Sequence, residues 1–201
     1  GTGTFNSATT SLLVGGLSPN VNYTFTLTAI NGTGASAPTA PYLRATLPLS
    51  ATVPTTTVIT NNSLTLGWTP PTGDALTGYS LLITGSGSGT GTFSVPVGNS
   101  FNVTGLTANT AYTFALTSQN ASGNSTPALS TTATTLPNTP TGLTATATAE
   151  TSITLGWTAP TDGATSYSVV VTGSGTGTGT FNSATTSLLV GGLSPNVNYT
   201  F

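Results

Sequence analysis

The sequence predicts an all-β protein built from tandem β-sandwiches, and three features point to this class. Apolar residues alternate with small or polar ones at a period of two, as in Leu64, Leu66 and Trp68. Gly, Pro and Asn separate these short segments at close intervals, which is typical of a sandwich. No segment keeps a 3.6-residue apolar period, so we expect essentially no helix.

The same alternation marks successive strands in two related units. In each unit one strand ends in tryptophan, the next opens with tyrosine, and a later strand begins at a second tyrosine. The apolar positions of these strands are Leu64, Leu66 and Trp68, then Tyr79, Leu81 and Ile83, then Tyr112, Phe114 and Leu116 in one unit, and Ile153, Leu155 and Trp157, then Tyr167, Val169 and Val171, then Tyr23, Phe25 and Leu27 in the other.

The composition excludes several classes of function. Charged residues make up 2% of this threonine-rich chain, against about 25% in ordinary soluble domains. With one Arg and no Lys, the chain cannot neutralise a phosphate backbone, so we expect no nucleic-acid binding. No apolar run approaches the length of a membrane span. Without Cys or His, it offers no disulfide and no thiolate or imidazole metal ligand, and we expect no cofactor.

Internal repetition is the strongest signal in the sequence. Residues 1–25, GTGTFNSATTSLLVGGLSPNVNYTF, recur unchanged as residues 177–201, a period of 176. A weaker period lies within this one. Leu17–Tyr23 resembles Leu106–Tyr112, 89 positions later, and Leu193–Tyr199 follows after a further 87. The 176-residue unit therefore consists of two related modules of about 88 residues each.

Module boundaries are predicted at two proline-containing joints, Thr46-Leu47-Pro48 and Thr135-Leu136-Pro137. Proline stiffens a joint and is excluded from central strands. With these boundaries, residues 48–136 form a complete module, and residues 1–47 form the C-terminal half of a module. Residues 137–201 form the N-terminal two-thirds of a module of the same type as the one ending at 47.

The duplicated ends permit two interpretations. In the first, the 201 residues are a window cut from a long covalent array. In the second, the half-modules of separate subunits complete one another in a strand-exchanged polymer. We favour the first, because the second leaves apolar strands such as Tyr23–Phe25 without a partner. Intact mass under denaturing conditions distinguishes them.

The order of these residues resembles the fibronectin type III module over the whole chain. The resemblance rests on Pro140-Thr-Gly-Leu143 before the first strand, Trp157 followed by Pro160, Tyr167 opening the third strand, the run from Leu193 to Tyr199, and the turn Ala29-Ile-Asn31-Gly-Thr-Gly34. It implies Ig-like sandwiches of seven strands each, joined like beads on a string into a rod.

The six-residue Leu-to-Tyr spacing is similar to a tyrosine corner, in which a buried tyrosine hydroxyl bonds upstream backbone. We therefore assign the repeated leucines and aromatics to the structural core rather than to a ligand site. These residues are Leu17, Leu106 and Leu193, with Tyr23, Tyr112, Tyr199, Trp68 and Trp157.

No catalytic site is predicted. Asp74 and Asp162 occupy equivalent loops about one domain apart, and Glu150 stands alone, so no carboxylate pair forms. One Asp in each loop indicates a turn more than a calcium site. The glycine runs 85–91 and 173–179 lack the Lys and helix of a phosphate loop. They are predicted to be flexible hairpin connections, with close lateral packing as the alternative.

These features favour a structural, non-enzymatic role. We expect a repeat unit of an extracellular filament, stalk or cell-surface adhesin, associating with itself end to end and also laterally. The alternative is a spacer in a secreted polysaccharide-degrading enzyme, which would need fewer and less similar copies. Glycan binding would require an exposed aromatic platform, and the candidate residues are Tyr42, Phe5, Phe93 and Phe181.

Overall fold

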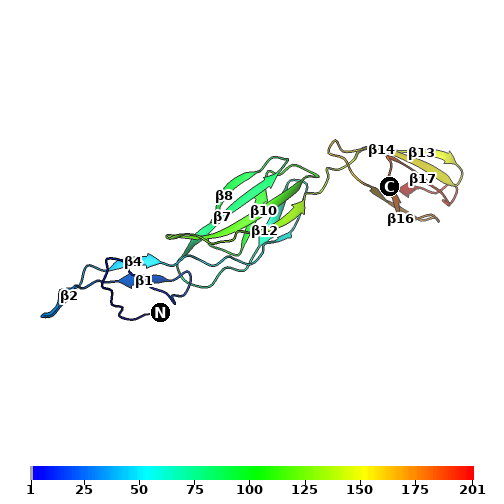
Figure 1. Ribbon diagram of the computed structural model, residues 1–201. Coiled ribbons are helices and arrows are strands. Elements are labelled where there is room, and N and C mark those ends of the chain that lie inside the picture. The colour runs from blue at the N-terminus through cyan, green and yellow to red at the C-terminus, as the bar shows by residue number, and fades with distance from the viewer. Residues whose placement is uncertain (1) are drawn as a thin grey trace.

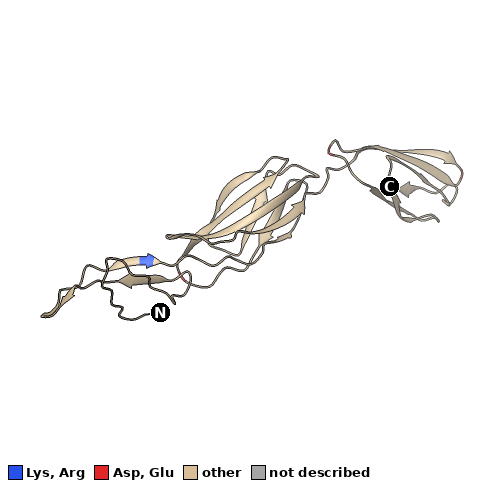
Figure 2. Ribbon diagram, viewed as in Figure 1, with Lys and Arg blue, Asp and Glu red and all other residues tan. Residues whose placement is uncertain are grey.

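The computed structural model describes residues 2–201, which form strands, turns and irregular segments with no helix assigned among them. Figure 1 shows three parts following one another along an extended molecule. We call them the N-terminal segment (1–47), the central sandwich (48–136) and the C-terminal segment (137–201). In the described part of the chain no helix could cross a membrane. Charge is sparse, and Arg44 is the single cation (Figure 2).

The central sandwich pairs two antiparallel sheets. The first has the order β5-β6-β9, and the second has the order β8-β7-β10, with β12 and the short β11 also paired to β10. With β11 and β12 counted as one interrupted strand, this is the predicted seven-stranded sandwich. The strands are β5 (Thr55–Thr57), β6 (Ser63–Gly67), β7 (Leu76–Gly85), β8 (Gly91–Val95), β9 (Ser100–Thr104), β10 (Ala111–Asn120), β11 (Gly123–Asn124) and β12 (Leu129–Thr134).

The predicted alternation forms the core of the central sandwich. Leu64, Leu66, Tyr79, Leu81 and Phe114 have no measurable exposure, because the inward residues of both sheets meet between the layers. The rings of Trp68 and Tyr79 pack edge to face, 5.0 Å between centroids. Such pairs stabilise a core beyond the apolar area that they bury.

The C-terminal segment repeats this arrangement with fewer strands. One sheet has the order β13-β14-β17 and the other β16-β15-β18. Trp157 and Tyr167 form the equivalent edge-to-face pair at 5.2 Å. The strands are β13 (Thr141–Ala149), β14 (Ser152–Thr158), β15 (Tyr167–Gly173), β16 (Gly179–Ser183), β17 (Ser187–Val190) and β18 (Tyr199–Thr200).

The described residues of the N-terminal segment, 2–47, contain two strand pairs. β1 (Asn22–Phe25) pairs with β4 (Tyr42–Ala45), and β2 (Ile30–Asn31) pairs with β3 (Gly34–Ala35). No strand is assigned over residues 2–21, although residues 177–201 have the same sequence as 1–25 and form β16, β17 and β18.

The predicted core residues are buried to different degrees. Leu106, Tyr112, Trp68 and Leu193 are buried. The other four, Leu17, Tyr23, Trp157 and Tyr199, are only half-buried. The physical reason is that the part of the chain described here has no strands corresponding to the β5-β6-β9 sheet to face β1 and β4, and no counterpart of β12 to cover β18.

All three tyrosines hydrogen-bond upstream backbone as a tyrosine corner does. The Tyr112 hydroxyl accepts from Thr107 N at 2.9 Å and donates to Ser88 O at 2.8 Å. The Tyr199 hydroxyl accepts from Ser194 N at 2.8 Å and donates to Thr176 O at 2.7 Å. The Tyr23 hydroxyl accepts from Ser18 N at 2.9 Å.

The glycine runs have a role that neither sequence-based interpretation included. A Cβ added at Gly85 would lie 2.8 Å from the Tyr112 ring, and one at Gly87 would collide with the Tyr112 hydroxyl. Gly173 and Gly175 lie in the same way against Tyr199. Alternate glycines thus let the loop close over the tyrosine, whose hydroxyl donates a hydrogen bond to the carbonyl of the next residue, Ser88 or Thr176.

Candidate functional site: the junctions between modules

The most extensive polar arrangement outside the cores lies where one module meets the next. At both junctions it is organised by an asparagine three residues before the corner tyrosine, Asn20 before Tyr23 and Asn109 before Tyr112. Both asparagines have positive φ, 55° and 47°. Asparagine tolerates this left-handed conformation better than most residues, so the turn projects its amide group outward from the module end.

Asn20 is fully buried at the first junction. Its amide N–H donates to Leu47 O at 3.0 Å, and its carbonyl accepts from Asp74 N and Ala75 N, both at 3.1 Å. Its side-chain Nδ2 donates to Thr72 O at 3.3 Å. Because bonds to Thr72, Asp74 and Ala75 cross from the N-terminal segment to the central sandwich, this one residue joins the two. A buried polar group bonded in this way stabilises one arrangement over alternatives.

Gly73 allows this approach. Its φ is +106°, and an added Cβ would collide with the Asn20 carbonyl oxygen and lie 2.8 Å from the Asn20 Cβ. The loop after the tryptophan strand therefore needs glycine for two reasons, the backbone conformation and the space.

The far end of β10 contributes a second group of contacts to this junction. Asn120 Nδ2 donates to Thr46 O at 2.7 Å and to Asn20 Oδ1 at 3.2 Å. Ser122 Oγ donates to Ala45 O. The first junction is thus closed from two loops of the central sandwich, one after the tryptophan strand and one after β10.

The second junction repeats part of this pattern in a more exposed form. Asn109 N donates to Leu136 O at 3.0 Å, and Asn109 Nδ2 donates to Asp162 O at 2.6 Å. Asn61 Nδ2 donates to Asn138 Oδ1 at 2.8 Å. The Asp162 carboxylate accepts from Asn138 N at 3.0 Å and from its Nδ2 at 3.1 Å.

The predicted turn aspartates therefore lie at the junctions. Asp74 contributes its backbone N–H to the first junction, and Asp162 contributes both its carbonyl and its carboxylate to the second. Glu150 lies in the turn between β13 and β14. Among residues 2–201, no three Asp or Glu side chains gather as metal ligands would.

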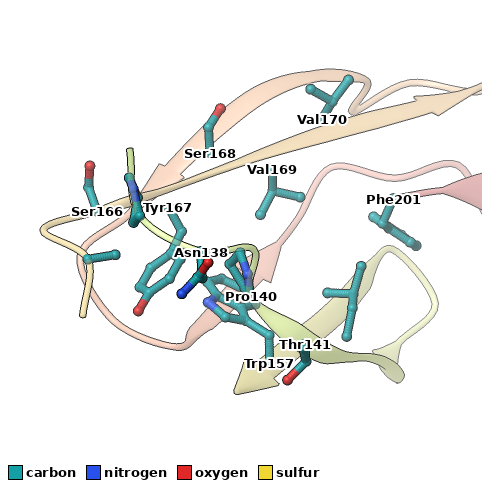
Figure 3. A pocket seen from close by; sticks show the side chains of 13 residues that line it. Asn138, Pro140, Thr141, Trp157, Ser166, Tyr167, Ser168, Val169, Val170 and Phe201 are labelled. Carbon is teal, nitrogen blue, oxygen red and sulfur yellow. The ribbon is translucent and has the colours of Figure 1, made fainter. Parts of the chain in front are cut away.

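A cavity of about 390 Å³ lies in the C-terminal segment. Figure 3 shows Trp157, Tyr167, Val169 and Phe201 around it. The equivalents in the central sandwich, Trp68, Tyr79, Leu81 and Phe114, are buried beneath a complete second sheet. The cavity is therefore the open side of a sandwich core.

The candidate glycan-binding aromatics do not form one platform. Tyr42 lies on β4 of the N-terminal segment, Phe93 on β8 of the central sandwich and Phe181 on β16 of the C-terminal segment. Phe5 precedes the first strand. Sequence reasoning missed Asn20, Asn109 and Asn120, although the repeated Asn three residues before each corner tyrosine was a signal that could have found two of them.

Comparison with known proteins places the chain in a family. The fibronectin type III domain matches residues 52–134 and 138–201. Chitinase A1 from Niallia circulans is 36% identical over 185 residues, which cover 79% of this chain and 25% of the enzyme. Endoglucanase B from Cellulomonas fimi is 30% identical over 165 residues, 74% of this chain and 15% of the enzyme. The chain thus spans a quarter or less of the length of these relatives.

Among solved structures, a segment of two fibronectin type III domains from chicken tenascin aligns with a TM-score of 0.46 and 24% identity, covering 74% of this chain and 86% of the segment. The two matched ranges lie within the central sandwich and the C-terminal segment. The chain belongs to the fibronectin type III family.

Proposed function

We propose that this chain is a non-catalytic spacer within a secreted polysaccharide-degrading enzyme, where it holds flanking domains apart outside the cell. The observation that carries the proposal is the likeness to parts of a chitinase and an endoglucanase, in which the matched region is only 25% and 15% of the enzyme. A region that forms a small part of an enzyme and consists of tandem sandwiches is suited to separating the other domains rather than to catalysing the reaction.

The junction geometry supports the same role. A spacer keeps a defined distance only where successive modules do not swing freely, and linkers between domains are mobile unless the interface restrains them. At the first junction, the bonds of Asn20 and Asn120 tie backbone on one side to backbone or side chain on the other. Proline at position 48, buried in this structure, stiffens the joint itself.

A second candidate is a repeat unit of an extracellular filament or surface adhesin. It is favoured by one observation, the unchanged recurrence of residues 1–25 as 177–201. In this candidate 1–47 and 137–201 are parts of one module type, and many copies lie end to end. Lateral association would use uncharged edges such as β8, which carries no Lys or Glu to discourage pairing.

One experiment separates the two candidates. Antibodies raised against the 201-residue chain identify the native polypeptide in the culture medium of its source organism, and its intact mass is measured under denaturing conditions. The same band is tested for hydrolysis in gels containing glycol chitin or carboxymethyl cellulose. A spacer predicts one band that reacts with the antibody and clears the polysaccharide. A polypeptide many repeats long that clears neither substrate would refute the spacer and support the filament.

A further inference from the structure

A four-residue turn begins eight residues after the corner tyrosine in two places, at Asn31 after Tyr23 and at Asn120 after Tyr112. The two copies, Asn31–Gly34 and Asn120–Gly123, share the pattern Asn, any residue, Ser or Thr, Gly. In both, the asparagine Oδ1 holds the turn from within. It accepts from Thr33 N at 2.9 Å in the first copy and from Ser122 N at 2.9 Å in the second. The local structural role of the asparagine is therefore the same in both copies.

The two copies differ in what surrounds them. Asn31 is exposed to solvent, at the end of β2 that lies away from the rest of the molecule (Figure 1). Asn120 is 8% exposed and lies against the N-terminal segment. Its Oδ1 holds the turn, while its Nδ2 crosses the junction to Thr46 O at 2.7 Å and Asn20 Oδ1 at 3.2 Å. One side chain thus performs two separable tasks.

The rest of the turn contacts the same stretch of the preceding segment. Ser122 Oγ donates to Ala45 O. A Cβ added at Gly123 would lie 3.1 Å from Leu47 Cδ2, so glycine leaves room for that leucine. The three positions that the two turns share, Asn, Ser or Thr, and Gly, therefore meet three consecutive residues, Ala45, Thr46 and Leu47.

We infer that this turn is a docking element, by which each module recognises the C-terminal end of the module before it. The inference deepens the spacer function and rests on it. The surface recognised is the last strand end, Ala45 to Leu47, together with the asparagine of the tyrosine-corner turn, Asn20. The corresponding surface at the C-terminal end of the central sandwich is Thr134 to Leu136 with Asn109. The turn around Asn31 would dock onto the end of a module that presents this surface.

Asparagine suits this task because of its amide group. Both junction partners of Nδ2, the Thr46 carbonyl and the Asn20 Oδ1, are hydrogen-bond acceptors. Aspartate has the same shape and keeps the acceptor that holds the turn, but it offers no donor and places a negative charge against two acceptors. Asn120→Asp therefore removes docking while it preserves the turn.

The test is amide hydrogen exchange measured by NMR on the 201-residue chain. The amides of Asp74 and Ala75 donate to Asn20 O across the junction, so their protection reports docking directly. The Phe114 amide in β10 reports the core. We expect Asn120→Asp to speed exchange at Asp74 and Ala75 by about tenfold or more and to leave Phe114 unchanged. Asn31→Asp is the matched control and should change none of the three.

Unchanged exchange at Asp74 and Ala75 in Asn120→Asp would overturn the inference, as would an equal effect of Asn31→Asp. If Asn120→Asp also exposes Phe114, Ser122→Ala decides. This variant removes only the hydroxyl that reaches Ala45, so faster exchange confined to Asp74 and Ala75 supports docking, and unchanged exchange contradicts it. If the native polypeptide hydrolyses no polysaccharide, the proposed spacer function fails, but the exchange result for docking between modules still stands.

Discussion

Residues 2–25 and 178–201 have one sequence and two structures. The C-terminal copy forms β16, β17 and β18, whereas β1 is the one strand assigned in the described residues of the N-terminal copy. Val190 and Leu193 are buried in the C-terminal copy, while their counterparts Val14 and Leu17 are half-buried. The strands in the C-terminal copy pair with β14 and β15, which the N-terminal segment does not contain.

The difference teaches that partner strands, more than local propensity, produce these strands. Threonine and valine favour a pleated surface in both copies, but strand propensity depends strongly on packing against neighbours. The duplication also provides an internal control for each substitution, because the same change can be made at the corresponding residue of the other copy.

The largest expected effect is that of Leu193→Ala. Leu193 belongs to the buried cluster with Leu155, Val171 and Val190, and truncating a buried leucine costs about 2–5 kcal/mol of unfolding free energy. The midpoint of urea unfolding, followed by Trp157 fluorescence in a Trp68→Phe background, should fall accordingly. Leu17→Ala, the matched change, should leave that transition in place. Equal shifts in the two variants would contradict the difference in packing.

A smaller effect is expected for Tyr199→Phe. This change removes a hydroxyl that bonds both Ser194 N and Thr176 O, and such bonds contribute about 1 kcal/mol each. Tyr23→Phe removes the single bond to Ser18 N. Hydrogen exchange at the Ser194 amide should therefore accelerate in Tyr199→Phe. The free energy of unfolding of the C-terminal segment should fall more in Tyr199→Phe than in Tyr23→Phe.

Tyr79→Phe provides a control for the Tyr199→Phe substitution. The Tyr79 hydroxyl is buried and has no hydrogen-bond partner in the structure, so its removal should leave stability unchanged or raised. A loss as large as that of Tyr199→Phe would show that the ring environment, rather than the hydroxyl bonds, determines the effect.

Much of the fold could be predicted from the sequence because alternation and spacing are local signals. The all-β class and the tandem fibronectin type III sandwiches are confirmed, and the backbone bonds of the three corner tyrosines match the predicted corner. The closure of the glycine runs over Tyr112 and Tyr199 was not predicted, since it depends on which side of the loop faces the ring. Boundaries at 48 and 137 and the assignment of core residues stay predictions.

The junctions were harder to predict for a physical reason. Asn20 and Asn120 are 100 positions apart, and neither carries a charge or a motif typical of binding. Their role arises only when two folded modules meet end to end. The sequence predicts Asp74 and Asp162 only as turn residues, whereas their backbones also contact the preceding module.

The spacer function requires that the first junction hold its two sides in one orientation, and a distance measurement tests this directly. The chain has no cysteine, so Thr24→Cys and Ser94→Cys, both at exposed positions, introduce a unique pair for spin labels. Pulsed electron paramagnetic resonance should give a single narrow distance distribution, which broadens in Asn120→Asp. A broad distribution in the unmodified junction would contradict a docked spacer.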